Sequence, residues 1–369
     1  MNNWKKVKLS DIIDFNPTER LPKGTTAKKV AMEKIEPFTR DIPEFELLEY
    51  KGGTKFRNGD TLMARITPSL ENGKTAKVSL LGEGEIGFGS TEFIVARAKK
   101  GISDENFVYY LMLDPNVREV AIKSMVGTSG RQRVQLDVVK NYEISCPPLE
   151  QQIEIGLTLK AIDDKIENNK KINHHLEQVA ISIFENMFPN ASSGEFTIGE
   201  YLTPKRGKNL LSKDAIDGTV PVVAGGLQPS TFHNIANTKS PVLTISASGA
   251  NAGYINLWHV PVWSSDSSYI DSSMTDDVYF WYVMLKKRQQ EIYDSQTGSA
   301  QPHIYPKHIE IMPTIELKEE DIRSFTKQVT PLFETIGDNL DEINRLKNLR
   351  DTLLPKLLSG EVSANQAAK

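Results

Sequence analysis

A periodic stripe in the middle of the chain restricts its fold more than any other feature. The segment that follows Pro147 and Pro148 contains no further proline until Pro189. From Ile162 to Ile183, apolar or asparagine residues recur at intervals of three and four, which is the spacing of a coiled-coil seam. Because proline breaks helices, the sequence predicts one long helix over residues 149–189.

The same pattern returns 170 residues later, over residues 317–360. Nearly all seam positions related by this offset are apolar or identical, the exception being Asn173 opposite Ile343. Pro331 lies inside the second pattern, so we expect the helix to break near it. The predicted seam consists of Ile162, Ile166, Asn169, Leu176 and Ile183 in the first helix and Leu332, Ile336, Asn339, Leu346 and Leu353 in the second.

A lone helix cannot bury such a seam, so the two helices are expected to pack on each other. A single chain that returns on itself favours antiparallel packing, with the globular blocks at opposite ends of a rod of roughly 50 Å. A buried asparagine at a seam lowers stability but can fix register. Asn169 and Asn339 are candidates for that role, and an exposed position is an equally open alternative.

The globular blocks also repeat. "VGTSGRQRVQLDVVKNYEI" in the first half corresponds to "SQTGSAQPHIYPKHIEI" in the second, matching Thr128 with Thr297, Gln132 with Gln301, and 140–144 with 307–311. Short alternating runs such as "TAKVSLLG" and "SPVLTISASG" predict strands, and "NFVYYLML" predicts a helix. We therefore expect a mixed α/β (α+β) fold with two repeated globular domains over 1–148 and 190–316. They are separated by two long antiparallel coiled-coil-like helices, and residues 361–369 form a disordered tail.

Composition narrows the function classes. The chain has no apolar run of membrane-spanning length, and its single cysteine, Cys146, fits a reducing cytoplasm. The net charge of −4 at first argues against nucleic-acid binding. However, the acidity lies in the two helical segments, and the globular blocks are near neutral to slightly basic.

Motifs for catalysis are missing from the sequence. It contains neither a G-x-x-x-x-G-K-[ST] loop nor a G-x-G-x-x-G loop, and its six histidines form no metal-binding spacing. The stretch "FNPTE" matches the Asn-Pro-Pro-aromatic motif of amino-methyltransferases only in part, and a turn is the better interpretation. We therefore expect a non-catalytic chain that binds no cofactor or metal.

Several loops are instead rich in hydrogen-bond donors. Arginine reads guanine, glutamine and asparagine read adenine, and serine, threonine and lysine contact phosphates. The small residues beside them would let the backbone approach a duplex closely. The candidate DNA contacts are Arg65, Thr67, Ser69, Asn72, Lys74, Arg131, Gln132 and Arg133 in the first half, and Lys205, Arg206, Lys208, Ser246, Ser248, Asn251, Ser299, Gln301, His303 and Tyr305 in the second.

These segments resemble, in order, those of a known family. "WKKVKLSDIIDF", "NGDTLMARITPSLENGKTAKV", the central helix from "PPLEQQIEIG", "PVLTISASGANAGYINLWHVPVWSSDSSYI" and "LLPKLLSGEV" are similar to segments of the specificity subunit of type I restriction–modification systems. The resemblance covers essentially the whole chain.

The resemblance implies a division of labour. Each recognition domain would read one half of a bipartite, asymmetric DNA site, and the helices would set the spacer and dock two modification subunits. Those subunits would carry S-adenosylmethionine, and restriction subunits, where two are present, would use ATP and Mg. Two alternatives stay open: a helical protein scaffold that does not read DNA, and a self-contained DNA methyltransferase.

Overall fold

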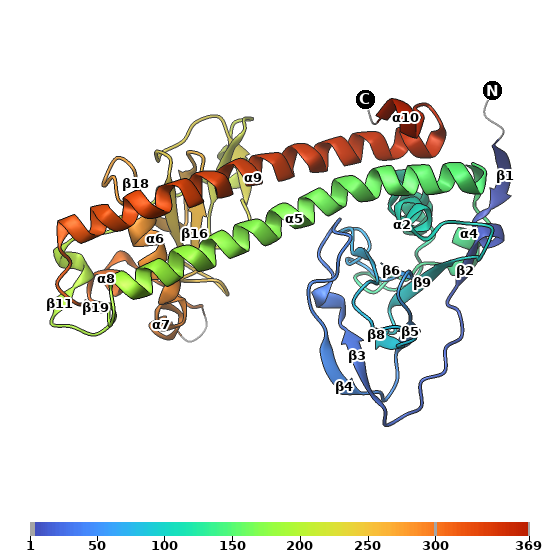
Figure 1. Ribbon diagram of the computed structural model, residues 1–369, viewed down its shortest axis with the longest axis horizontal. Coiled ribbons are helices and arrows are strands. Elements are labelled where there is room, and N and C mark those ends of the chain that lie inside the picture. Colours follow the sequence, from blue (N-terminus) through green and yellow to red (C-terminus); the bar gives the residue numbers. More distant parts are fainter. Residues whose placement is uncertain (1–3, 299–300, 368–369) are drawn as a thin grey trace. The chain divides into compact units, whose positions relative to one another are not determined.

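The computed structural model describes residues 4–298 and 301–367. It separates into two compact units, which we call unit 1 (Met1–Asn168 with Glu342–Lys369) and unit 2 (Asn169–Asp341). The division falls inside both long helices, α5 (Leu149–Met187) and α9 (Glu319–Ser359). Each unit therefore contains one globular domain and part of both helices (Figure 1).

Unit 1 contains two four-stranded sheets and one short strand pair. The first sheet is antiparallel and has the order β2 (Ile13–Phe15), β9 (Phe93–Ala98), β6 (Thr61–Ala64), β7 (Thr75–Lys77). The second has the order β4 (Glu46–Glu49), β3 (Thr26–Val30), β8 (Gly87–Gly89), β5 (Thr54–Phe56), and β3 runs parallel to β8. The pair consists of β1 (Lys5–Lys8) and β10 (Glu143–Cys146).

Helix α2 (Glu105–Leu113) forms the centre of the unit 1 core. Asp104 caps its first turn through the backbone N–H groups of Asn106 and Phe107. Asp114 ends the helix and caps α3 (Pro115–Lys123). The short helices α1 (Leu9–Ile12) and α4 (Leu136–Lys140) complete the domain.

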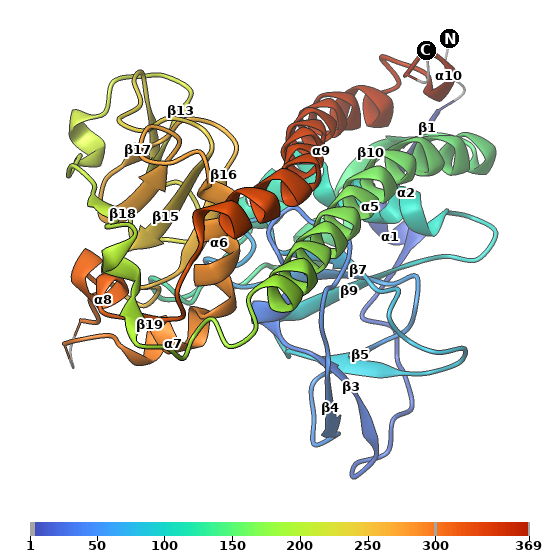
Figure 2. The same ribbon diagram turned by 60° about the vertical axis from the view of Figure 1, so that its left-hand side comes forward.

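Both long helices belong to this core. Ile155 and Leu159 of α5, and Leu354 and Leu357 of α9, are buried among the side chains of α2. In unit 1 the first part of α5 lies beside the last part of α9, and the two run in opposite directions (Figures 1 and 2). The antiparallel helices are therefore packed on the domain as well as on each other.

Unit 2 repeats this topology. Its main sheet has the order β12 (Lys205–Arg206), β18 (Ser267–Asp271), β15 (Val242–Ser246), β16 (Ile255–Trp258). A second sheet has the order β14 (Thr231–His233), β13 (Val220–Val223), β17 (Trp263–Ser264), and β13 runs parallel to β17 as β3 does to β8. Strand β11 (Phe196–Thr197) pairs with β19 (Pro313–Thr314) as β1 does with β10. The remaining helices are α6 (Val278–Lys287), α7 (Gln289–Asp294) and α8 (Pro306–Glu310).

Aromatic rings fill the core of unit 2. Phe184 and Phe188 of α5 contact Phe325 of α9 and Phe280 of α6, with ring centroids 5.1–6.1 Å apart. Phe333 of α9 lies against the same cluster. Here too, the apolar face of each long helix is shared between its partner helix and the domain.

The expected fold class, a mixed α/β fold with two repeated domains and two long helices, is confirmed. The repeat offset is 170 from α4 to α8 and from α5 to α9. The match of 140–144 with 307–311 was wrong, because 140–144 leads from α4 into β10 whereas 307–311 covers most of α8. The similarity of these two five-residue segments does not reflect the structural repeat, which follows the offset of 170 residues.

The expected seam lies on the buried or half-buried side of both helices. Ile166 and Asn169 are fully enclosed, whereas Ile162, Leu176, Ile183, Leu332, Ile336, Leu346 and Leu353 are half-buried. The Nδ2 of Asn339 donates a hydrogen bond to the Oδ1 of Asn173 at 2.7 Å. The one polar mismatch in the sequence repeat thus forms a polar contact between the helices.

The break expected near Pro331 was wrong, because α9 continues through it from Glu319 to Ser359. Proline removes one backbone hydrogen bond from a helix. The neighbouring Val329 and Phe333 are fully buried, and their packing holds this turn in the helix. The hydroxyl of Thr335 also donates to the Pro331 carbonyl at 2.8 Å.

The expectation of a disordered tail over 361–369 was also wrong for residues 361–367, which the structure describes. Gly360 adopts a φ of +75°, which ends α9, and α10 (Ala364–Ala367) follows. Ser363 and Gln366 cap α10 through reciprocal hydrogen bonds, and Ala364 is buried. Among the described residues, none of the helices is long and apolar enough to cross a membrane.

Candidate nucleic-acid interface

Two predicted loops meet in unit 1. The loop after β6 and the loop between α3 and α4 are joined by an antiparallel bridge between Ile66 and Arg133. The N–H of Thr67 donates to the carbonyl of Gln132 at 3.0 Å. Segments far apart in the sequence therefore form one surface.

The equivalent loops meet in unit 2. Ser248, after β15, bridges to His303, and the N–H of Gly249 donates to the carbonyl of Pro302 at 3.1 Å. A second bridge joins Thr297 to His303. The two candidate DNA-binding loops of the second half are thus also one surface.

The backbone hydrogen bonds of the two surfaces correspond one to one. Val134 N–H donates to Arg65 carbonyl at 2.9 Å in unit 1, and Ile304 N–H donates to Ala247 carbonyl at 2.9 Å in unit 2. The structure therefore aligns Arg133 with His303 and Gln132 with Pro302. The match of Gln132 with Gln301 was wrong by one position, and the match of Thr128 with Thr297 was wrong by two, because the bridges that close the two loops make Thr297 equivalent to Val126 and His303 equivalent to Arg133.

Arg133 is the most firmly held side chain of the unit 1 surface. Its Nε and Nη2 donate to the carboxylate of Glu92 at 2.7–3.0 Å, and this hydrogen bonding raises the pKa of the guanidinium. Arg131 is exposed beside it. A planar fork of this kind restricts a long side chain to one direction.

The other unit 1 candidates differ in accessibility. Thr67 donates its hydroxyl to Glu71, and the ammonium of Lys74 donates to the Met32 carbonyl at 2.9 Å. Lys74 is therefore tied to the protein. Asn72 is exposed, and Arg65, Ser69 and Gln132 are half-buried.

In unit 2, Arg206 and Ser248 converge on one carboxylate. Arg206 Nη2 lies 2.6 Å from Asp266 Oδ1, and the Ser248 hydroxyl donates to the other oxygen of Asp266. Lys205 and Lys208 are exposed on either side of Arg206. A basic strand edge therefore lies next to the loop pair.

The remaining unit 2 candidates are spread over this surface. Asn251 donates to the Gly225 carbonyl at 3.5 Å, and Gln301 is exposed. Ser246 is only 4% exposed inside β15, so its hydroxyl is not on the loop surface. Ser299 lies outside the described residues.

A ladder of stacked rings adjoins the same loops. His303 stacks on Tyr305 with ring centroids 5.9 Å apart, and Tyr305 stacks on His308 at 5.7 Å. The N–H of Tyr305 donates to Nδ1 of His308. Because Tyr305 is 47% exposed, the ladder presents an aromatic face beside polar donors.

The sequence analysis did not identify Glu92 and Asp266. Both directly precede an interior strand of their sheet, β9 or β18, and the carbonyl of each accepts a backbone hydrogen bond from the opposite loop. Those bonds come from Arg65 at 2.9 Å and Ala247 at 3.1 Å. An acidic residue just before the strand in both "STEFIV" and "SSDSSYI" was the available signal.

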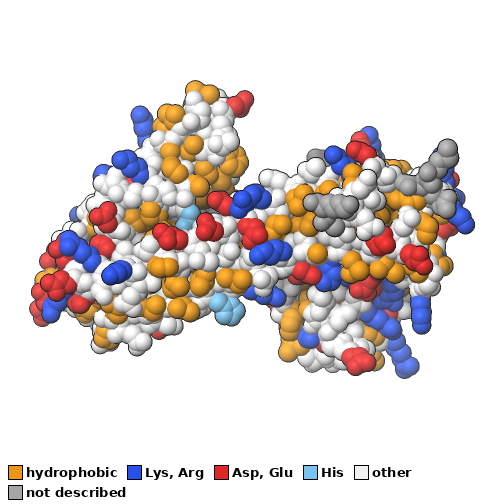
Figure 3. All heavy atoms as spheres, turned by 45° about the horizontal axis from the view of Figure 1, so that its top comes forward, with side chains coloured by type: hydrophobic (Ala, Val, Ile, Leu, Met, Phe, Trp, Pro, Cys, Tyr) orange, Lys and Arg blue, Asp and Glu red, His pale blue; other side chains and the backbone are white. Residues whose placement is uncertain are grey.

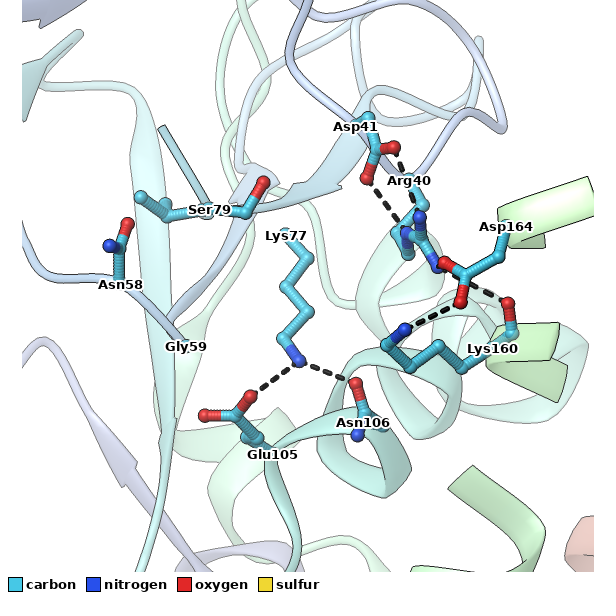
Figure 4. Close-up of a pocket in the computed structure, with 11 residues that line it drawn as sticks. Arg40, Asp41, Asn58, Gly59, Lys77, Ser79, Glu105, Asn106, Lys160 and Asp164 are labelled. Atoms are coloured by element: carbon cyan, nitrogen blue, oxygen red, sulfur yellow. Dashed lines mark hydrogen bonds and ion pairs between the residues drawn. The ribbon is translucent and has the colours of Figure 1, made fainter. Parts of the chain in front are cut away.

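A polar cavity of about 410 Å³ lies elsewhere in unit 1, where the domain meets α5 (Figure 4). The guanidinium of Arg40 donates two hydrogen bonds to the carboxylate of Asp41 and another to that of Asp164 in α5, at 2.7 Å. Lys77 extends toward Glu105 and Asn106, at 2.8 Å from the Glu105 carboxylate. Each cation is paired with a carboxylate, and the Arg40–Asp164 pair attaches the domain to α5, whereas the Lys77–Glu105 pair lies within the domain.

Chemical reactivity is low at the one cysteine. Cys146 is buried at the end of β10, and burial raises the pKa of its thiol to about 11. At neutral pH it is therefore a protonated thiol and a poor nucleophile. Among residues 4–298 and 301–367, no group of three or more His, Cys, Asp or Glu side chains is arranged to hold a metal ion.

The geometry defines a class of protein: two repeated domains, each presenting a paired loop surface, with long antiparallel helices built into both cores. Comparison with known proteins narrows that class. Residues 1–178 match the family model described as the type I restriction modification DNA specificity domain.

Relatives agree with that match. The chain is 28% identical over 311 residues to the type I restriction enzyme MjaIX specificity subunit of Methanocaldococcus jannaschii, covering 73% of this chain and 71% of the relative. It is 38% identical over 161 residues to the EcoAI specificity subunit of Escherichia coli, covering 42% of this chain and 27% of the relative. The fold is similar to that of the type I restriction–modification system S subunit from M. genitalium, with a TM-score of 0.60, 20% identity, and coverage of 97% and 96%. Residues 1–178 are therefore similar to a type I restriction modification DNA specificity domain, and the chain is similar in fold to the M. genitalium S subunit.

Proposed function

We propose that this chain reads DNA sequence for a type I restriction–modification complex. Each domain contacts one half of a bipartite site through its paired loop surface. The site is asymmetric, because aligned loop positions carry different side chains, such as Arg133 against His303. The protein acts in the cytoplasm.

The observation that carries this proposal is the meeting of the predicted loops in both units. Four donor-rich segments, whose side chains suit base edges and phosphates, form two equivalent surfaces through equivalent backbone bridges. Arginine, serine, asparagine and histidine side chains are gathered there, in an arrangement suited to direct readout of a duplex.

The long helices would set the distance between half-sites and dock partner proteins. Apolar side chains stay exposed along both helices, where they are candidates for protein contact. They are Ile153, Leu157, Ile172, Val179, Leu340 and Leu349, between 38% and 53% exposed. Figure 3 shows apolar, acidic and basic side chains interspersed on one face of the molecule. Two modification subunits, with two restriction subunits where present, are the proposed partners.

The chain itself is proposed to be non-catalytic. S-adenosylmethionine would be bound by the modification subunit, and ATP and Mg by the restriction subunit. The buried, protonated Cys146 supports this assignment, since it offers no activated nucleophile.

The test is a genome-wide map of methylated adenines in cells that express this gene with its neighbouring modification gene, compared with cells lacking only this gene. We expect a bipartite, non-palindromic motif that disappears with the gene. An unchanged map, with both proteins present, would overturn the proposal and favour a scaffold. Methylation by the purified chain alone would instead show a self-contained methyltransferase.

A further inference from the structure

The acidic residue before one interior strand of the main sheet occupies an equivalent place in both domains. Glu92 precedes β9 and Asp266 precedes β18, and each is hydrogen-bonded through its carbonyl to the loop after β6 or β15. In both domains the carboxylate then bonds to an arginine of the candidate surface. Two occurrences in a repeated fold indicate a shared role.

The Arg133–Glu92 pair leaves a defined set of donors available. An arginine has five N–H donors in one plane. Glu92 engages the edge formed by Nε and Nη2, at 2.7–3.0 Å. The donors of Nη1 and the second N–H of Nη2 lie on the other end of the fork. Two N–H groups in that arrangement match the O6 and N7 acceptors of guanine.

Exposure indicates which partner faces outward. The Arg133 side chain is 46% exposed, whereas that of Glu92 is 23% exposed. The backbone N–H of Glu92 donates to the Ser90 hydroxyl at 3.1 Å, which helps to fix the backbone of this residue. The acid is thus the anchored member of the pair and the arginine the presented one.

In the unit 2 pair the arginine is again more exposed than the acid, and a serine also bonds to the acid. Arg206 is 41% exposed and Asp266 is 33% exposed. Asp266 bonds Arg206 through one oxygen and Ser248 through the other, so it orients two candidate contacts at once. Here the arginine comes from the strand edge and the serine from the loop.

We propose that Glu92 and Asp266 are positioning residues for base readout, which direct Arg133 and the Arg206–Ser248 pair, respectively, toward the duplex. This inference rests on the proposed function. Each carboxylate acts through its partner side chains and affects only the half-site read by its own domain. Removing the carboxylate frees the arginine to rotate, so base preference decreases while the attraction of its charge to phosphate persists.

The experiment selects sites from a pool of random-sequence duplex DNA with the full chain in complex with its modification subunit. Glu92→Gln should reduce base preference roughly tenfold at one or two positions of a single half-site, in line with the usual discrimination of a bidentate arginine contact. The other half-site should be unchanged. Asp266→Asn should give the mirror-image result. Glu119→Gln is the matched control, because Glu119 pairs with exposed Lys123 on α3 of the same domain.

A double variant separates positioning from direct contact. If Glu92 acts through Arg133, then Glu92→Gln should add no loss of preference in an Arg133→Ala background. Additive losses would overturn the inference, since they would mean that Glu92 touches a base itself. Arg133→Lys keeps the charge but cannot form the fork, and it should reproduce the effect of Glu92→Gln. This provides a second test if Glu92→Gln folds poorly.

The possible outcomes separate a failure of the proposed function from a failure of the positioning role. A wild-type complex that selects no bipartite motif would overturn the proposed function. A wild-type complex that selects a motif, with the same base preferences in Glu92→Gln, would overturn only the positioning role. A drop in binding that is equal for all sequences would also contradict it, because that result indicates a general loss of fold or charge.

Discussion

Arg350 Nη1 of α9 lies 2.9 Å from Asp163 Oδ1 of α5, and both side chains are almost entirely buried, at 6% and 4% exposure. Tyr110 of α2 donates its hydroxyl to the other oxygen of Asp163 at 2.7 Å. The guanidinium also donates to the Phe38 carbonyl at 3.2 Å. One ion pair therefore joins both helices of unit 1 to its domain.

Breaking this pair should be strongly destabilising. Asp163→Ala removes the buried carboxylate and leaves the buried Arg350 paired only with Asp351, whose side chain is 62% exposed. We expect a loss of about 3–5 kcal/mol in the free energy of unfolding. Urea denaturation followed by circular dichroism measures the loss. Lys165→Ala is the control, since it removes an exposed pair with Glu342 between the same helices and should cost under about 1 kcal/mol. Similar losses for the two variants would contradict the prediction.

Pro331 should be a site where stability can be gained. Its ring removes a backbone hydrogen bond to the carbonyl four residues earlier, at Lys327, and its side chain is exposed. Pro331→Ala should therefore raise the free energy of unfolding by about 1–3 kcal/mol. Thermal melting of the full chain tests this. A lower melting temperature would mean that the proline ring makes a stabilising contact.

Helix length should set the spacer of the recognised site. One heptad inserted after Asn168, and a matching heptad after Asp341, keeps the seam in register and adds about 10.5 Å. That length corresponds to about three base pairs of B-DNA. Methylome mapping should show a longer spacer between unchanged half-sites, and a change in either half-site would refute the ruler role. A heptad in one helix only should abolish site-specific methylation.

His259 should make unit 2 less stable in acid. Burial lowers its pKa from the ordinary value of 6.5, although the nearby charges of Asp341 and Asp338 oppose the shift. The imidazole of His259 therefore binds a proton more tightly in the unfolded chain than in the folded one. The stabilising contribution of the neutral His259 is complete above about pH 6.5 and decreases below it. Between pH 7.5 and 5.5, the melting temperature of His259→Gln should decrease less than that of the wild type. Exposed His174→Gln should behave like the wild type, and parallel profiles for all three proteins would refute this assignment.

The helices and the repeat were predictable because their signals are periodic and local. Ile162 and Ile166 show the helical spacing directly, and the offset of 170 residues duplicates it. The passage of α9 through Pro331 was not predictable, since it depends on the tertiary burial of Val329 and Phe333. Local preference favoured a break, and packing prevented it.

The candidate surface was predictable in composition but not in arrangement. Arg133 and Ser248 stood out as donors in small-residue loops. Their bonds to Glu92 and Asp266 depend on segments that are distant in sequence, and the position of each acid just before a strand does not show which side chain it bonds. Lys74 also stood out as a donor in such a loop, but its ammonium is bonded to the Met32 carbonyl of the protein itself.

The loop pairs are joined by main-chain hydrogen bonds, which almost any side chain permits. Arg65 and Ala247 occupy the same place in the two domains and make the same backbone contacts, although one is long and charged and the other is a methyl group. Under the proposed function, substitutions at these two positions would alter the side chain presented to DNA while the backbone hydrogen bonds between the loops remain. If these loops read DNA as proposed, heritable change in the recognised sequence would accumulate one residue at a time, without each new specificity requiring a new fold.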